Sequence, residues 1–203
     1  MKVKVGGRSL EEEVELVQAL NEELGDAVSL RLDANRAWSL EEAERFARGT
    51  VGVRFEYVEE PLADSAWLPS FARACGMPVA LDESLAGIEP EALEDRWYAR
   101  AVVLKPTLLG GLSRTLRFAS RASRLHMEPV ISSAYETGVG TAALVALAAG
   151  VGNEEVLAGL DTYRRLAGDV LRPRLDLPAP RVAVRAMEGT RREIDRRLLR
   201  PVG

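Results

Sequence analysis

Five apolar runs in this chain carry charged residues at or near their ends, and the runs recur about every 25 positions. The gaps are 29, 26, 23 and 23 residues between Lys4, Asp33, Glu59, Asp82 and Lys105. A strand, a loop and a helix together take about that many residues. The near-equal spacing therefore indicates a closed ring of parallel strands whose ends direct these charged groups toward one point.

Seven short runs are rich in Val and Leu and nearly continuous in apolar residues, which is typical of strands buried on both faces. They lie at residues 2–5, 28–32, 53–58, 78–81, 101–104, 128–131 and 155–159. Helical patterns fill the intervals between them. We expect helices at residues 10–24, directly after Ser39, and at 64–75, 111–125, 137–149 and 185–198.

Two of these helices begin with the sequence signature of a capping box. Ser9 is followed three positions later by Glu12, and Ser39 is followed by Glu42. In the first helix, we expect Val17 and its apolar neighbours to face the core, with the glutamates on the opposite face.

The alternation of strands and helices predicts parallel βα units, which form either an open sheet or a closed barrel. An open sheet concentrates function on one or two loops, whereas here at least five successive strands end in charged residues, which favours a TIM-like (β/α) barrel. We count seven strands of the eight required, and expect the missing first strand to precede Met1. We interpret residues 1–203 as a single, partial barrel catalytic domain with a proline-rich C-terminal extension from about residue 165.

Composition limits the partners of this chain. The formal net charge of −4 argues against nucleic acid as the main partner, because phosphate binding favours a basic surface. No apolar run reaches the roughly 18 residues of a membrane helix, so we expect no membrane association. The single Cys75 excludes an internal disulfide, and no signal peptide follows Met1, so we expect a cytoplasmic location.

Three of the strand-end residues are carboxylates: Asp33, Glu59 and Asp82. If they converge, they repel one another, and a hard cation relieves that repulsion. Oxygen ligands without a nearby His or Cys indicate Mg²⁺, or Mn²⁺, rather than zinc. The alternative is that these are solvated or salt-bridged loop residues.

The lysines suit chemistry beside such a metal. Lys2 and Lys4 are two positions apart on one strand and point to the same side, while Lys105 would approach from the opposite wall. Two lysines across a metal-bound carboxylate suit abstraction of a proton next to that carboxylate, in a small-molecule carboxylate substrate. The alternative for Lys2 and Lys4 is an exposed edge strand, where Lys is common.

Two further pairs are weaker candidates for substrate binding. Gly110 and Gly111 precede a helix and could receive an anion, or could simply form the turn. Ser132 and Ser133 follow the sixth strand and could donate hydrogen bonds to a substrate carboxylate, or could cap the next helix.

The chain resembles the enolase superfamily in its muconate-lactonizing-enzyme-like subgroup, and within it the o-succinylbenzoate synthases. The resemblance covers residues 2 to about 162 and follows the family order of seven motifs: KVKVG, LRLDANRAW, VEEPL, ALDESLAG, VLKPTLLGGL, ISSAYETGVG and AGLDT. It implies a Mg²⁺-dependent dehydration of 2-succinyl-6-hydroxy-2,4-cyclohexadiene-1-carboxylate to 2-succinylbenzoate, in menaquinone biosynthesis.

The same resemblance assigns roles to the candidate residues. It implies that Asp33, Asp82 and Glu59, rather than Glu60, hold Mg²⁺. Lys4 would abstract the α-proton, Lys105 would stabilise the enediolate, and Lys2 would support Lys4. The resemblance further implies that Asn35 supports the metal site and that Ser132 and Ser133 contact the succinyl portion of the substrate.

The chain departs from the family pattern at its N-terminus, where family members carry an α+β capping domain before the barrel. Two alternatives therefore stay open beside the synthase. One is an N-acylamino acid racemase or dipeptide epimerase, which also needs two opposed lysines, although GLDTY lacks the DxD motif typical of the epimerases. The other is an inactive barrel fragment. An unpaired edge strand would also favour self-association.

Overall fold

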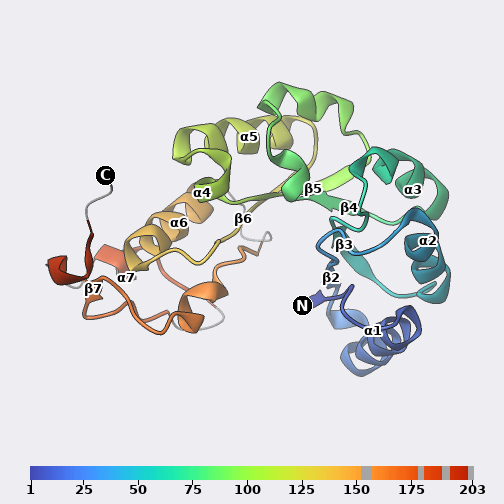
Figure 1. Ribbon diagram of the computed structural model, residues 1–203, viewed down its shortest axis with the longest axis horizontal. Helices are drawn as coiled ribbons and strands as arrows, with labels where there is room; N and C mark the ends of the chain where they lie inside the picture. The colour runs from blue at the N-terminus through green and yellow to red at the C-terminus, as the bar shows by residue number, and fades with distance from the viewer. Residues whose placement is uncertain (152–156, 178–180, 189–192, 201–203) are drawn as a thin grey trace. The chain divides into compact units, whose positions relative to one another are not determined.

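The structure is a computed structural model that describes residues 1–151, 157–177, 181–188 and 193–200 (Figure 1). Six strands form one sheet in chain order: β1 (Lys2–Lys4), β2 (Leu30–Asp33), β3 (Phe55–Glu59), β4 (Val79–Leu81), β5 (Ala99–Leu104) and β6 (Glu128–Ile131). The pairs from β1 to β5 are parallel, as the alternating pattern predicts.

Six of the seven predicted strands are confirmed to within two residues at each end. The seventh, at 155–159, lies partly outside the described residues. Residues 157–159 of it are described, and of these Gly159 forms an isolated parallel bridge with Ser132.

The helices also follow the prediction closely over the first 151 residues. They are α1 (Leu10–Leu24), α2 (Leu40–Gly49), α3 (Leu68–Cys75), α4 (Pro106–Leu109), α5 (Leu112–Arg124) and α6 (Gly138–Val151). Short 3₁₀ helices lie at Gly25–Ala27, Ser65–Trp67, Glu83–Leu85, Pro90–Asp95 and Asp161–Arg165. Both capping boxes are confirmed. The hydroxyls of Ser9 and Ser39 accept a hydrogen bond from the backbone amide of the third helical residue, and the carboxylate of that residue accepts one from the serine backbone amide.

The chain contacts divide into two compact units. The first comprises Met1–Val103 with Arg121–Glu128, and the second comprises Leu104–Ser120 with Pro129–Gly203. The single catalytic domain inferred from the sequence stays a prediction.

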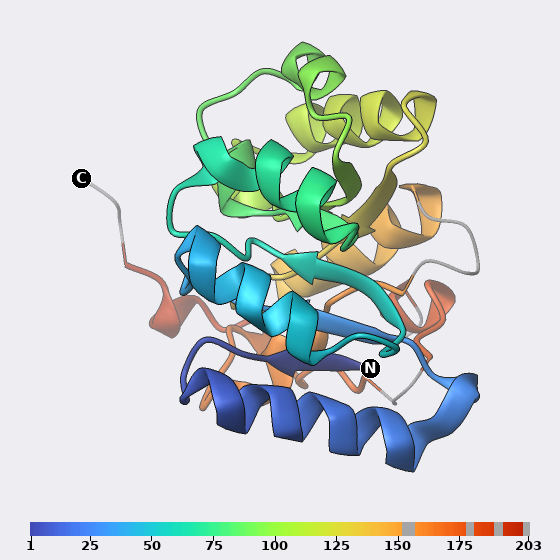
Figure 2. The same ribbon diagram turned by 90° about the vertical axis from the view of Figure 1, so that its right-hand side faces the viewer.

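In the first unit, α1, α2 and α3 lie side by side along the outer face of β1 to β4 (Figures 1 and 2). Val17, Phe46 and Phe71 project from these helices and are fully buried. They pack in the same core as Leu32 and Val58 of the strands, which are also inaccessible to solvent. Burying each such side chain contributes roughly 1.5–3 kcal/mol, so this layer holds the strands in place.

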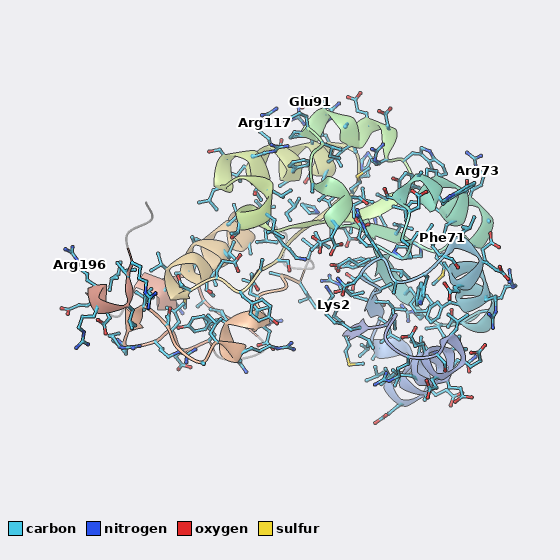
Figure 3. The ribbon with its side chains drawn as sticks, viewed as in Figure 1. Lys2, Phe71, Arg73, Glu91, Arg117 and Arg196 are labelled. Atoms are coloured by element: carbon cyan, nitrogen blue, oxygen red, sulfur yellow. The ribbon has the colours of Figure 1, made fainter. Side chains whose placement is uncertain are left out.

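The opposite face of these strands carries charged groups. Lys2 lies on the side of the strands away from Phe71 of α3 (Figure 3). The parallel register pairs Lys4 with Asp33 and Asp33 with Glu59. Because side chains alternate between faces along a strand, this register places Lys2, Lys4, Asp33 and Glu59 on one face.

In the second unit, a small core of Tyr163, Leu171 and Leu175 packs the C-terminal segment. Its centre is a buried polar group: Oδ2 of Asp169 accepts a 2.6 Å hydrogen bond from the Tyr163 hydroxyl. Oδ1 of Asp169 accepts from the amide of Gly138, the first residue of α6, at 2.9 Å. This carboxylate therefore attaches the extension to the start of α6.

The predicted helix at 185–198 is wrong over most of its length. Only α7 (Arg185–Glu188) is helical, and β8 (Glu193–Ile194) and a 3₁₀ turn (Arg196–Leu198) follow it, while residues 189–192 lie outside the described part. The reason is tertiary pairing: β8 pairs antiparallel with β7 (Leu171–Arg172) of the extension. That pairing overrides a helical pattern that consists mostly of exposed charges.

In the part of the chain that the structure describes, none of the helices combines the length and the apolar character needed to span a bilayer.

Candidate active site

Four charged side chains meet at the carboxyl ends of β1, β2 and β3. Nζ of Lys2 lies 2.7 Å from Oε2 of Glu59 and 3.0 Å from Oδ2 of Asp33. Nζ of Lys4 lies 3.3 Å from the same Asp33 oxygen. The two lysines and two of the three predicted metal ligands are thus brought together, as the sequence predicts.

These carboxylates are buried, and their surroundings shift their ionisation. Burial raises the pKa of Glu59 well above its ordinary value; the negative charges of Asp33 and Asp82 add to this increase, while Lys2 acts against it. Burial also acts to raise the pKa of Asp33, but the ammonium groups of Lys2 and Lys4 outweigh it and hold that pKa below its usual value. A negative charge on the buried Glu59 is therefore unfavourable unless a cation lies next to it.

Lys2 is the cation that lies next to Glu59 and Asp33. Burial acts to lower the pKa of Lys2, but the neighbouring carboxylates of Glu59 and Asp33 raise it overall. Its side chain is 40% exposed, whereas that of Lys4 is 70% exposed. Lys4 is thus the more open of the two amines and the better placed to meet a molecule from solvent.

The three carboxylates do not form a ready coordination set. Among the residues that the structure describes, no group of three or more His, Cys, Asp or Glu side chains is arranged to hold a metal ion. Instead, Lys2 bridges Asp33 and Glu59. Metal binding would therefore require the Lys2 ammonium to move aside.

The donor groups nevertheless fit a hard divalent cation. Oε1 of Glu59 is buried and accepts no hydrogen bond from any described part of the chain. Asp33, Glu59 and Asp82 are all at least nine-tenths buried, and their donor atoms are exclusively oxygen. Such a set matches Mg²⁺ or Mn²⁺, and the unpaired oxygen of Glu59 is an atom that a cation could satisfy.

Asn35 lies where a supporting residue is expected. Its side-chain oxygen accepts a 2.6 Å hydrogen bond from Nζ of Lys4, and its backbone amide donates to Oδ1 of Asp33 at 3.3 Å. Asn35 therefore connects the candidate base to a candidate metal ligand and orients both.

The remaining candidates lie in the second unit. Lys105 is half-buried at the N-cap of α4. Gly110 and Gly111 have φ of 91° and 110°, values that glycine adopts readily, and the amides of both donate to the Pro106 carbonyl. The turn is thus a sufficient reason for both glycines, and anion binding stays a prediction.

Ser132 and Ser133 are buried at the end of β6. Both hydroxyls donate to the carbonyl of Gly159, at 3.2 and 3.1 Å, and Ser133 also lies 2.6 Å from the Thr162 hydroxyl. They connect neighbouring strand ends rather than cap α6. Their contact with substrate stays a prediction.

The burial of two glutamates was not predicted from the sequence. Glu60 is completely buried next to Glu59, and Glu13, expected on the exposed face of α1, is 2% exposed. Oε1 of Glu13 accepts from the backbone amides of Gly6, Gly7 and Arg8, which follow β1. The signal for Glu60 is its place directly after a strand-end ligand, because successive strand residues face opposite sides and Glu60 therefore needs a partner of its own.

Comparison with known proteins decides the family. Residues 1–198 match the family model described as enolase C-terminal domain-like. The chain belongs to this family. Membership confirms the resemblance to the enolase superfamily and the TIM-like (β/α) barrel fold class that the strand-end charges predict.

Known relatives of this family member include an o-succinylbenzoate synthase from Thermobifida fusca (strain YX), which is 40% identical over 172 residues. The match covers 83% of this chain and 53% of the relative. The chain thus spans about half the length of the curated relatives it matches.

Solved structures give the same fold with other activities. The L-Ala-D/L-Glu epimerase of Bacillus subtilis is 29% identical, with a TM-score of 0.71 over 84% of this chain and 48% of the epimerase. A muconate cycloisomerase from Pseudomonas fluorescens is 25% identical, with a TM-score of 0.74 over 86% and 49% of the two chains. Enzymes similar to this family member therefore share a barrel and differ in reaction.

Proposed function

We propose that this chain carries the catalytic barrel of a Mg²⁺-dependent o-succinylbenzoate synthase, which dehydrates 2-succinyl-6-hydroxy-2,4-cyclohexadiene-1-carboxylate to 2-succinylbenzoate. The observation that carries the proposal is the joining of Lys2 and Lys4 to Asp33 and Glu59 at adjacent strand ends. The 40% identity to a synthase supports the choice of substrate.

Asp33, Glu59 and Asp82 would hold the cation. When bound, Mg²⁺ supplies positive charge next to the substrate carboxylate, where negative charge develops as the α-proton leaves. The buried surroundings of Glu59 strengthen such electrostatic effects, because water is largely excluded there.

Lys4 in its neutral form would abstract the proton α to the substrate carboxylate. Protonated by that step, its ammonium group would then give a proton to the departing hydroxide, so water leaves and the ring becomes aromatic. The 2.6 Å hydrogen bond to Asn35 orients Nζ for both transfers. Lys2, whose pKa the neighbouring carboxylates raise, would stay charged near the site and support Lys4 electrostatically.

Lys105 would stabilise the negative charge that forms on the substrate, and Ser132 and Ser133 would contact its succinyl portion. These roles rest on the family resemblance and on the position of each residue at a strand end.

A racemase or epimerase of N-acylamino acids or dipeptides is the second candidate. The 29% identity to an epimerase of solved structure favours it, and a lysine pair serves either reaction. Against it, the GLDTY segment at 159–163 lacks a DxD motif.

The test uses the purified 203-residue chain with millimolar Mg²⁺ and two substrates. Formation of 2-succinylbenzoate from the cyclohexadiene acid, lost on addition of EDTA, is the expected result. Exchange of the α-proton of N-succinyl amino acids with deuterated solvent, without dehydration of the first substrate, would favour the second candidate. A folded chain that catalyses neither reaction would contradict both and favour an inactive barrel.

A further inference from the structure

The candidate metal ligands follow three strands, and the loops after those strands share one buried side chain. Glu60 is completely buried, and its two carboxylate oxygens accept four hydrogen bonds. Oε1 accepts from the backbone amides of Asp82 at 2.8 Å and Ser84 at 2.7 Å. Oε2 accepts from the Ser84 hydroxyl at 2.8 Å and from Nε of Arg36 at 3.1 Å.

The backbone at two of these loops takes a conformation that side chains other than glycine adopt rarely. Asn35 and Arg36, after β2, have φ of 44° and 59°, and Glu60, after β3, has φ of 40°. Such backbone persists only where the surrounding contacts determine it, and it is concentrated at functional sites. The turn after β3 directs the Glu60 side chain under the neighbouring loop, away from the face of Glu59.

Backbone hydrogen bonds complete the connection. The amide of Arg36 donates to the Glu60 carbonyl at 2.7 Å, and the amide of Glu60 donates to the Ala80 carbonyl of β4 at 3.0 Å. A second guanidinium nitrogen of Arg36 donates to the Ser84 hydroxyl at 2.9 Å. Arg36, Glu60 and Ser84, one from each loop, therefore form a closed triangle of contacts.

Each corner of this triangle lies close in sequence to a candidate metal ligand. Arg36 lies three residues after Asp33, Glu60 directly follows Glu59, and the Asp82 amide is itself a donor to Glu60. We propose that Glu60 is a positioning residue, which sets the spacing of Asp33, Glu59 and Asp82 and thereby the affinity for a divalent cation without touching it. The inference rests on the proposed function, because that function requires these carboxylates to share one ion.

The test is a titration of the chain with Mn²⁺, in which free Mn²⁺ is followed by electron paramagnetic resonance. Glu60→Gln replaces one acceptor oxygen by an NH₂ group that meets donors. We expect its Mn²⁺ dissociation constant to rise about 10- to 100-fold, as for other residues that orient metal ligands. The amides of Asp82 and Ser84 should exchange hydrogen faster in this variant.

Glu13→Gln is the matched control. Glu13 is also a buried carboxylate that accepts backbone amides after a strand, but its loop carries none of the three candidate ligands. Its Mn²⁺ dissociation constant should stay within about threefold of that of the unsubstituted chain. Circular dichroism with EDTA present shows which variants are folded before metal is added.

If Glu60→Gln does not fold, Arg36→Gln tests the inference in its place. The Arg36 side chain is 35% exposed, so its replacement should destabilise the fold less than replacement of the buried Glu60. We expect about a tenfold loss of Mn²⁺ affinity, against none for Arg45→Gln, which breaks the surface pair with Glu11. Equal affinity in the folded variants and the unsubstituted chain would overturn the inference alone. An unsubstituted chain that binds no Mn²⁺ would overturn the proposed function and the inference together.

Discussion

The ammonium group of Lys2 lies 2.7 Å from the carboxylate of Glu59, a side chain that is 1% exposed. Lys2 thus compensates a buried negative charge that its own strand does not carry. In the proposed enzyme, a divalent cation and the Lys2 ammonium compensate the same carboxylate charges. The effect of losing either one therefore depends on whether the other is present.

Lys2→Met should therefore destabilise the metal-free chain more than the metal-loaded chain. We expect a loss of about 1–2 kcal/mol in the free energy of unfolding in EDTA, because the buried Glu59 then lacks its cationic partner and Asp33 keeps only Lys4. Saturating Mg²⁺ should recover most of it. Urea unfolding with and without Mg²⁺ measures both values, and an equal loss in the two conditions would contradict the shared-charge account.

Lys4→Ala should abolish turnover and leave metal binding largely intact. Loss of a general base costs at least about 10²–10⁴-fold in rate, and Lys4 contacts Asp33 and Asn35 without being a metal donor. The comparison of kcat with Mn²⁺ affinity on one preparation separates the two effects. Near-normal kcat in this variant would reject the role of Lys4.

Asp82→Asn should weaken binding of Mg²⁺ by at least about tenfold, because the site loses one formal negative charge. Asp64→Asn is the control: Asp64 is an acid in the loop after β3, as Asp82 is in the loop after β4, but its side chain caps a 3₁₀ helix at the amide of Ala66. Isothermal titration of both variants measures the affinities. An Asp82→Asn variant with unchanged affinity would remove Asp82 from the ligand set.

The Asp169 carboxylate should make the second unit sensitive to acid. Burial acts to raise the pKa of Asp169, but hydrogen bonds from Tyr163 and from the amides of Gly138, Val170 and Leu171 outweigh it and lower that pKa. A lowered folded-state pKa contributes stability that is fully present above the unfolded value of 3.8 and is lost as pH falls through the folded value.

Asp169→Asn should thus lower the free energy of unfolding by about 1–3 kcal/mol at pH 7, and by progressively less below about pH 4. Tyr163→Phe removes one donor to Asp169 and the acceptor of the Leu175 amide, and should cost about 1–2 kcal/mol at pH 7. Denaturant unfolding between pH 7 and 3 measures the difference. If the difference in free energy of unfolding between Asp169→Asn and the unsubstituted chain stayed constant over this range, the charge of Asp169 would not be the cause of the stabilisation.

Gly138 and Gly150 begin and nearly end α6, and they should respond oppositely to alanine. A Cβ at Gly138 would overlap Oδ2 of Asp169 and come within 2.7 Å of Cδ1 of Leu171, whereas a Cβ at Gly150 meets no atom of the described residues within 4 Å. We expect Gly138→Ala to lower the melting temperature and Gly150→Ala to raise the free energy of unfolding by about 0.4–1 kcal/mol. Calorimetry on both variants checks this, and equal effects would contradict the packing at Gly138.

The sequence predicts the strands and the capped helices of the first 151 residues well because each of those elements has a local cause. Apolar runs mark β1 to β6, and Ser9 and Ser39 mark two helix starts. The charged residues at 185–198 have no such cause, and pairing with a distant strand decides their structure. Local pattern is thus informative where the element is buried and weak where it is exposed.

The candidate site divides in the same way. Lys2, Lys4, Asp33 and Glu59 are predictable because the two-residue alternation of a strand fixes their face. The direction of the Glu60 side chain is not predictable, because it follows from a backbone φ of 40° at Glu60, and no glycine marks that turn in the sequence. The pairing of Lys2 with Glu59 is likewise a product of register between strands, which a single sequence does not specify.

The most direct test of the account is the anomalous diffraction of Mn²⁺ in crystals of this chain. The account predicts one peak within about 2.0–2.3 Å of a carboxylate oxygen from each of Asp33, Glu59 and Asp82, with the Lys2 ammonium displaced from its bridging position. A folded, Mn²⁺-soaked chain in which Lys2 still bridges Asp33 and Glu59 and the ion lies elsewhere would contradict it.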